Sequence, residues 1–311
     1  MQTLFDFSAV PVVAIDVSGR VGRPRRHEAV LVEGPQGWGE FSPLGDDDLA
    51  TTARWLTAAT EPGTVGWPDP VRGRIPVAVG VPAVDAVSAH HIVTESRCRT
   101  ATVEVGSGDD VARLQAVRDA LGVGGAIRCD AHGRWRRDEA AAAIARLDRA
   151  AGGLEFVARP CRDAGDVAAL RRSIDIRIAM VASAEAGPAE AADIALLTCG
   201  PLGGARRALR VAERTGLPCV VTSGPQTTIG LGAGLALAGA LPDLPFACDL
   251  AAMPDGDVVA DSRRLRPVDG FLPVAPMPPA PQPDLLARHA VTDPDRVAWW
   301  RDRIRAAAAA V

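Results

Sequence analysis

Short apolar runs alternate with alanine-rich segments from residue 75 onward, and the pattern recurs about every 20 to 28 residues. The alanine-rich segments show helical periodicity, most clearly at residues 109–121, 137–150 and 203–216. Eight apolar runs have the character of buried strands: residues 75–81, 100–105, 126–131, 154–159, 176–181, 194–198, 218–223 and 246–251. This alternation predicts an α/β fold with a parallel sheet, closed into a (β/α)8 barrel. The fifth unit is thin, because residues 183–193 leave room for only a short helix.

The two ends of the chain do not follow this pattern. The N-terminal segment alternates apolar and polar residues in the manner of antiparallel strands, at residues 10–17, 27–34 and 37–44, and a capped helix follows at 46–59. Near the C-terminus, a proline-rich connection leads to an amphipathic helix, in which Trp299 and Trp300 are expected to anchor a core or an interface. We therefore expect an α+β capping domain at 1–74, the barrel at 75–252, and a tail at 253–311 that packs back on the cap.

Composition excludes several classes of function. The formal net charge is −4, and no basic tract suggests nucleic-acid binding. The N-terminus lacks the pattern of a signal peptide, and no apolar run reaches the roughly 18 residues of a membrane span. We expect a cytoplasmic protein with no membrane or nucleic-acid partner. The oligomeric state stays open.

Cysteine and lysine usage narrows the possible chemistry. The six cysteines are widely spaced and form no CxxC pair, so we expect reduced thiols in the core. All 34 basic residues are arginine, and the chain contains no lysine. A Schiff base, a phosphate-binding loop lysine and a lysine general base are therefore excluded.

Several local motifs resemble those of o-succinylbenzoate synthases of the actinobacterial type, in the enolase superfamily. The resemblance covers nearly the whole chain and includes GPQGWGEFSPL (34–44), IPVAVGVPAVDA (75–86), IRCDAHGRW (127–135), PLGGARRALRVAE (201–213), PVDGFLPV (267–274) and DPDRVAWW (293–300). It implies the same layout, a small α+β cap followed by a barrel. It also implies a dehydration in which Mg²⁺, held by three carboxylates, stabilises an enediolate while two lysines face each other across it.

Position by position, the resemblance implies that most of this machinery is missing. The family's lysine-x-lysine falls on Thr102 and Glu104, and the opposing lysine falls on Thr198. The first metal carboxylate falls on Asp130 and is kept. The second and third fall on Ala158 and Val181. One aspartate cannot hold Mg²⁺ by itself, so we expect no metal and no other cofactor.

Active sites of such barrels lie at the C-terminal ends of the strands. The polar residues that the sequence places there are Glu104, Asp130, His132, Arg159, Ser183, Glu185, Thr198, Thr222, Ser223 and Asp249. We expect His132, Asp130 and Glu104 to be catalytic. We expect substrate binding by Arg159, Ser183, Thr198, Thr222 and Ser223.

Three of these residues admit two interpretations. His132 is either a proton-transfer group at the rim, since a histidine beside a carboxylate can exchange protons near neutral pH, or a partly exposed loop residue. Glu104 and Arg159 either form a structural ion pair, or Arg159 binds a substrate carboxylate. We predict that Arg159 lies within hydrogen-bonding reach of Glu104 or Asp130, with Glu104 as the favoured partner, and that His132 stays free.

A glycine-bearing loop, residues 222–230, precedes a helix whose first amides could receive an anion. Two hypotheses about function follow from the whole pattern. The first is a repurposed, metal-independent lyase, cyclase or isomerase acting on a small carboxylated molecule. The alternative is a non-catalytic pseudoenzyme with a binding or scaffolding role. Authentic o-succinylbenzoate synthesis ranks below both.

Overall fold

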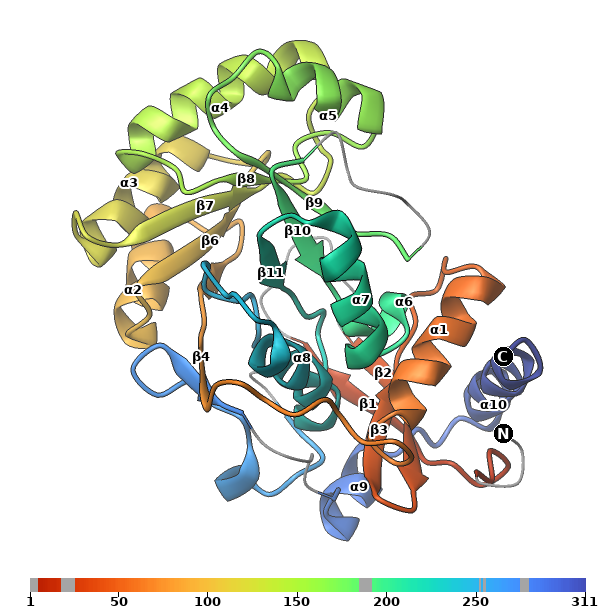
Figure 1. Ribbon diagram of the computed structural model, residues 1–311. Helices are drawn as coiled ribbons and strands as arrows, with labels where there is room; N and C mark the ends of the chain where they lie inside the picture. Colours follow the sequence, from red (N-terminus) through yellow and green to blue (C-terminus); the bar gives the residue numbers. More distant parts are fainter. Residues whose placement is uncertain (1–4, 18–25, 185–191, 252, 254–255, 275–279) are drawn as a thin grey trace.

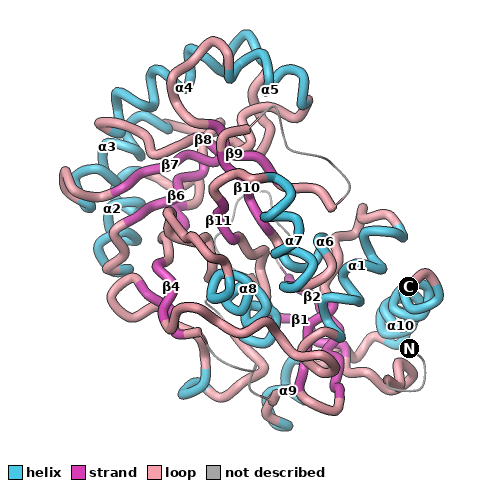
Figure 2. The backbone as a smooth tube through the Cα atoms, in the orientation of Figure 1, coloured by secondary structure: helices cyan, strands magenta, loops and turns pink. Residues whose placement is uncertain are grey.

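The computed structural model describes residues 5–17, 26–184, 192–251, 253, 256–274 and 280–311. Within them, a curved parallel sheet runs in the order β11-β10-β9-β8-β7-β6-β5, and helices cover its outer face (Figures 1 and 2). The strands of this sheet are β5 (Val79–Val81), β6 (Thr100–Glu104), β7 (Ala126–Asp130), β8 (Val157–Ala158), β9 (Ile178–Val181), β10 (Ile194–Leu197) and β11 (Cys219–Val221).

The predicted eighth strand is present only as two isolated bridges. Cys248 pairs with Val77, and Asp249 pairs with Thr222, so the segment joins the two edges of the sheet and closes the barrel. The segment 246–251 therefore takes the predicted place of the eighth strand, but it pairs at too few residues to form a regular strand. Residues 185–191, which contain Glu185 and most of the thin fifth unit, lie outside the described residues.

The barrel helices form where alanine and leucine recur at helical spacing, and most of them begin at a capping aspartate or threonine. They are α2 (Ala86–Ser96), α3 (Asp110–Leu121), α4 (Arg137–Ala151), α5 (Ala164–Arg171), α6 (Cys199–Leu202), α7 (Ala205–Thr215) and α8 (Thr228–Ala240). Asp85, Asp109 and Asp163 each accept a backbone N–H of the helix that they precede, which satisfies an amide that has no partner inside the helix. None of the described helices is long and apolar enough to cross a membrane.

The N-terminal part forms a three-stranded antiparallel sheet with one helix. These elements are β1 (Val12–Asp16), β2 (Arg26–Gly34), β3 (Gly37–Phe41) and α1 (Leu49–Thr60). A second, two-stranded sheet pairs β4 (Arg74–Pro76) with β12 (Phe271–Pro273). The remaining elements are η1 (Asp261–Arg263), α9 (Pro283–His289) and α10 (Pro294–Ala309).

The C-terminal helix α10 packs against the N-terminal sheet and α1 (Figure 1). Trp300 is buried and meets Phe41 edge-on, with 6.2 Å between the ring centroids. Trp299 is 39% exposed and carries Arg296 over its ring, so only one of the two tryptophans is a core anchor. All six cysteines are free and buried, as predicted.

Candidate functional site

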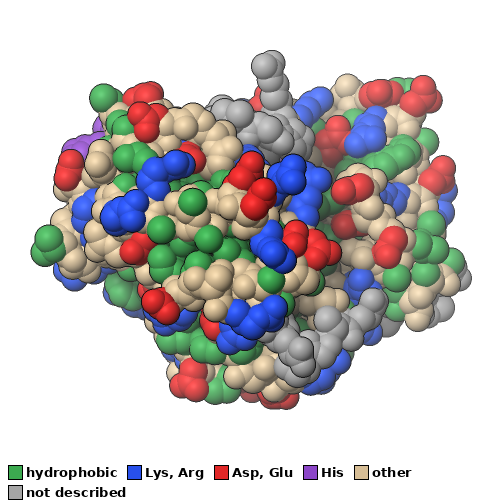
Figure 3. Space-filling view, turned by 90° about the horizontal axis from the view of Figure 1, so that it is seen from above, with side chains coloured by type: hydrophobic (Ala, Val, Ile, Leu, Met, Phe, Trp, Pro, Cys, Tyr) green, Lys and Arg blue, Asp and Glu red, His purple; other side chains and the backbone are tan. Residues whose placement is uncertain are grey.

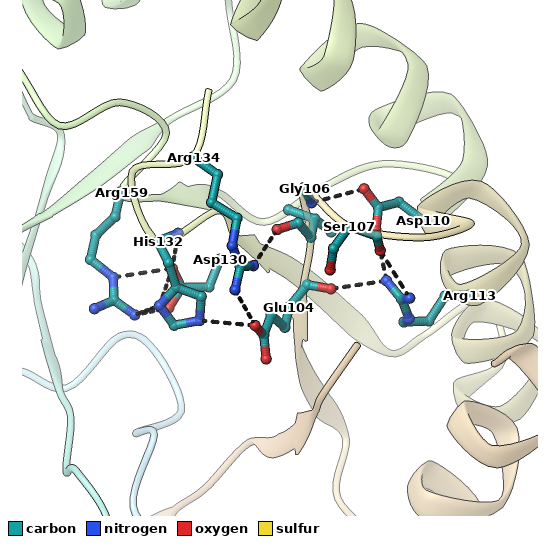
Figure 4. Close-up of polar contacts among 10 residues, drawn as sticks. Glu104, Gly106, Ser107, Asp110, Arg113, Asp130, His132, Arg134 and Arg159 are labelled. Atoms are coloured by element: carbon teal, nitrogen blue, oxygen red, sulfur yellow. Dashed lines mark hydrogen bonds and ion pairs between the residues drawn. The ribbon is translucent and has the colours of Figure 1, made fainter. Parts of the chain in front are cut away.

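The ends of β6, β7 and β8 bring three predicted site residues together at the C-terminal end of the barrel. Glu104 and Asp130 are register partners on β6 and β7, and Asp130 lies opposite Ala158 on β8. Arg159 follows β8 directly. Parallel pairing therefore places two carboxylates and a guanidinium side by side at the C-terminal ends of these strands, as Figure 4 shows.

Arg159 binds Asp130. Its Nε donates to Asp130 Oδ1 at 3.1 Å, and its Nη2 donates to Oδ2. The Asp130 side chain is 14% exposed and that of Arg159 is 32% exposed. Two donors on two oxygens form the bidentate geometry that guanidinium and carboxylate favour. This confirms the prediction that Arg159 lies within hydrogen-bonding reach of Glu104 or Asp130, with Asp130 as the partner.

His132 is held by the same two residues. Its backbone N–H donates to Asp130 Oδ1 at 3.0 Å, and its Nδ1 lies 2.7 Å from Arg159 Nη2. Its Nε2 lies 4.0 Å from Glu104 Oε1. The expectation that His132 stays free was wrong. A φ of 51° turns the chain back at this residue, so the ring lies between the arginine and Glu104 and does not point outward from the rim.

Glu104 pairs with Arg134, which the sequence did not single out. Arg134 Nη2 donates to Glu104 Oε1 at 2.6 Å, and its Nη1 donates to the Val105 carbonyl at 2.9 Å. The expected partner, Arg159, is taken by Asp130. The turn at His132 and Gly133, where φ is 69° at the glycine, carries Arg134 back over the end of β6. That glycine was the only signal of the reversal.

The loop after β6 is fixed by a buried arginine on α3. Arg113 donates to the Glu104 carbonyl at 3.1 Å and to Asp110 at 2.7 Å, and Asp110 in turn accepts the Gly106 amide at 2.8 Å (Figure 4). Arg113 is only 3% exposed. Arg113 therefore holds the backbone of Glu104, and Arg134 holds its side chain.

The predicted substrate-binding hydroxyls form a separate group on the other strands. Thr198 and Thr222 share a hydrogen bond of 2.8 Å between their hydroxyls. Ser223 donates its backbone N–H to the Asp249 carbonyl at 2.9 Å, and Ser183 is exposed after β9. Among the described residues, the hydrogen bonds of Thr198, Thr222 and Ser223 link them to one another's strands and to Asp249, not to Glu104 or Asp130.

The expected anion site at the start of α8 is filled by the chain's own carboxylates. Glu40 of β3 accepts the backbone N–H of Thr227 at 2.9 Å, and Asp257 accepts that of Thr228 at 3.1 Å. Thr227 itself caps the Ile229 amide. Two buried acids therefore occupy the amides that a ligand would need, and the expectation of ligand binding there was wrong.

The side chains around Asp130 do not fit Mg²⁺. Asp130 is in contact with Arg159, and its neighbour across the strand pair, Ala158, offers no oxygen ligand from its side chain. The resemblance assigns the other two metal carboxylates to Ala158 and Val181. In the described part of the chain, no group of three or more histidine, cysteine, aspartate or glutamate side chains is arranged to hold a metal ion. A small dication needs several oxygen donors to offset its dehydration, and a guanidinium in contact with the remaining carboxylate opposes it. That the protein binds no metal stays a prediction.

Comparisons with known proteins agree on the fold. Residues 85–281 match the model of enolase C-terminal domain-like proteins, and residues 12–62 match that of enolase N-terminal domain-like proteins. The 2-chloromuconate cycloisomerase of Rhodococcus opacus has a similar structure, with a TM-score of 0.74 and 18% identity over 91% of this chain and 98% of that one.

Two relatives are similar in sequence over nearly their whole length. The o-succinylbenzoate synthase of Thermobifida fusca is 44% identical over 91% of this chain and 90% of its own. That of Mycolicibacterium smegmatis is 38% identical over 94% of this chain and 93% of its own.

Proposed function

Because this chain belongs to the o-succinylbenzoate synthase family of the enolase superfamily, we propose that it is a repurposed member, a metal-independent enzyme that moves a proton on a small carboxylated molecule. Its reaction belongs to the lyase, cyclase or isomerase classes. The observation that carries this proposal is the arrangement at the end of β7, where Arg159 binds Asp130 and positions His132 beside Glu104.

The contact with Arg159 sets the tautomer of His132. A guanidinium can only donate hydrogen bonds, so Nδ1 of the ring must accept, and the proton of the neutral imidazole is on Nε2. A neutral imidazole fixed in this way can donate to an oxygen on which negative charge develops. This role replaces the proton-transfer role that the sequence suggested for His132.

Glu104 is the group that takes the proton in this proposal. Its Oε1 is bound by Arg134, and its Oε2 accepts no hydrogen bond from the described residues. Arg159 has a further donor, Nη1, that binds no described residue and can receive a ligand carboxylate. Glu104 removes a proton from the carbon next to a carbonyl group, and His132 Nε2–H stabilises the resulting enolate oxygen. On isomerisation the proton returns to another carbon of the ligand, and on elimination it goes to a leaving hydroxyl group of the ligand, which departs as water.

Proton exchange tests this proposal without knowledge of the physiological substrate. The protein is incubated in D₂O with EDTA and either o-succinylbenzoate or simple 4-oxo acids, and deuterium uptake beside the carbonyl is followed by NMR. We expect exchange that Glu104→Gln and His132→Ala each slow by about 10²-fold or more. Glu139→Gln, an exposed carboxylate on α4, is the matched control and should exchange at the wild-type rate.

The alternative, a non-catalytic binding protein, is favoured by one observation. Glu104 and Asp130 are each already bound by an arginine of the chain. Binding of these acids without deuterium uptake in any of them would favour this alternative. Exchange that occurs in a parallel incubation without EDTA and is absent with EDTA would contradict the metal-independent mechanism.

A further inference from the structure

A polar cluster lies inside the barrel, one layer below Glu104 and Asp130. Arg128 on β7 is fully buried, at 0% exposure. Its Nε donates to the Thr102 hydroxyl at 2.7 Å, and its Nη2 donates to Asp249 Oδ1 and to the Ala247 carbonyl, both at 2.9 Å. Thr102 also donates to Asp249 Oδ1, at 2.5 Å. None of these contacts belongs to the site described above.

Asp249 is the main counter-charge of Arg128. Glu155 is the other acid nearby, at 3.7 Å from Arg128 Nη1, but neither Nη1 nor Glu155 Oε2 has a hydrogen-bond partner in the described part of the chain. Burial raises the pKa of Glu155, although the charges of Arg128 and Arg177 oppose this. A buried guanidinium needs a paired charge, so the Arg128–Asp249 contact fixes the aspartate in place.

One carboxylate oxygen of Asp249 accepts no hydrogen bond from the described residues. Both of its side-chain hydrogen bonds arrive at Oδ1, and Oδ2 accepts none from the described residues. Its side chain is 26% exposed, although Arg128 on the inner side is fully buried. Asp249 pairs with Thr222 just beyond β11, at the C-terminal end of the barrel. The partly exposed carboxylate therefore lies at the C-terminal end of the barrel, next to Thr222 of the Thr198–Thr222 pair.

We propose that Asp249 is a second binding residue of the barrel mouth, which accepts a hydrogen bond from a hydroxyl or ammonium group of the ligand. The inference rests on the proposed function, because the same ligand places its carboxylate on Arg159. The ligand class is then a small hydroxy or amino carboxylic acid. A carboxylate can only accept hydrogen bonds. A ligand without a donor group removes water from Asp249 and forms no hydrogen bond in its place, so donor-free analogues bind more weakly.

Three dicarboxylates of the same chain length distinguish binding by Arg159 from binding by Asp249. They are succinate, malate and aspartate, which carry a hydrogen, a hydroxyl and an ammonium group, respectively, at one carbon. Their dissociation constants are measured by NMR titration of the full chain. We expect malate or aspartate to bind at least about tenfold more tightly than succinate, the scale of one hydrogen bond to a charged group. Asp249→Asn should remove this preference by weakening the binding of malate and aspartate, and it should not weaken the binding of succinate.

Asp249→Asn also leaves Arg128 without its counter-charge, so the double variant Arg128→Met/Asp249→Asn provides a second, charge-neutral test with the same expected result. Equal wild-type affinity for all three acids, lost together in Arg159→Ala, would contradict the role of Asp249 and leave the proposed function standing. A preference that survives in either Asp249 variant would also contradict it. Failure of all three acids to bind the wild type would contradict the carboxylate site on Arg159, and with it this inference.

Discussion

At the residue scale, two neighbours of Asp130 have unusual backbone conformations. Arg159 and His132 have φ values of 48° and 51°, in the left-handed region that residues with side chains rarely adopt. Strain of this kind persists where surrounding contacts hold it, and it is common at functional sites. Here both residues contact the same aspartate. The sequence could predict that Arg159 binds an acid, but the choice between Glu104 and Asp130 depends on two turns that its pattern does not specify.

Arg159→Ala should lower the free energy of unfolding by about 1–3 kcal/mol, because it leaves a largely buried carboxylate short of two donors. The loss is smaller than the roughly 3–5 kcal/mol of a fully buried pair, since Asp130 keeps the His132 amide and Arg159 is a third exposed. Urea denaturation measures it. Arg137→Ala, an exposed arginine on α4, should change stability by less than about 0.5 kcal/mol. Equal effects of the two substitutions would contradict the pairing.

At the element scale, buried acids of the N-terminal part cap helices of the barrel. Glu40 of β3 binds the start of α8, and Glu61, at the end of α1, accepts the amides of Ala205 and Arg206 at the start of α7. A negative charge at a helix N-terminus is favourable. The helices themselves could be predicted from their periodicity and capping residues. These caps could not, because Glu40 and Thr227 are 187 residues apart.

Glu40→Gln should destabilise the protein by about 1–3 kcal/mol at neutral pH, and the loss should shrink in acid. Burial raises the pKa of Glu40, but hydrogen bonds from His27, Thr227 and Ser42 and the charge of His27 outweigh it, so the net pKa is lowered. Its stabilisation is therefore present above the ordinary glutamate pKa of about 4.3 and is lost as pH falls through the lowered folded-state pKa.

Unfolding curves of the wild type and of Glu40→Gln between pH 3 and pH 7, about the range where carboxylates titrate, measure this dependence. Glu33→Gln, an exposed glutamate on β2, is the control and should show no such difference. A gap between wild type and Glu40→Gln that widens toward acid pH would contradict the assignment.

At the scale of the whole molecule, the strand–helix alternation predicted the barrel because each unit buries its own apolar face. Apolar side chains from most of its strands join buried clusters with the helices outside them. The sequence was less informative where pairing is short, as at β8 with two residues and at the segment around Asp249. On the face shown in Figure 3, arginines and acidic residues are interspersed, so no large patch of one charge forms there. We therefore do not expect this face to attract ligands of one charge by long-range electrostatics.

The inherited dehydration should be undetectable above background, because the chain has no lysine to serve at either family position. The variant with lysine at 102, 104 and 198 and carboxylates at 158 and 181 should recover traces of it. Absorbance assays with the cyclohexadiene substrate of the family, with and without Mg²⁺, measure both proteins. Robust turnover by the unmodified chain, abolished by a chelator, would contradict the account.

Calorimetric titration with Mg²⁺ and Mn²⁺ tests most directly whether an arginine has replaced the metal ion. We predict no stoichiometric binding to the wild type, because Arg159 binds the one carboxylate that remains at that position. The variant Ala158→Glu/Arg159→Gln/Val181→Asp adds two carboxylates to Asp130, which makes three, and removes the guanidinium, so it should gain divalent-ion binding. One tight site in the wild type that disappears in Asp130→Asn would contradict the central claim.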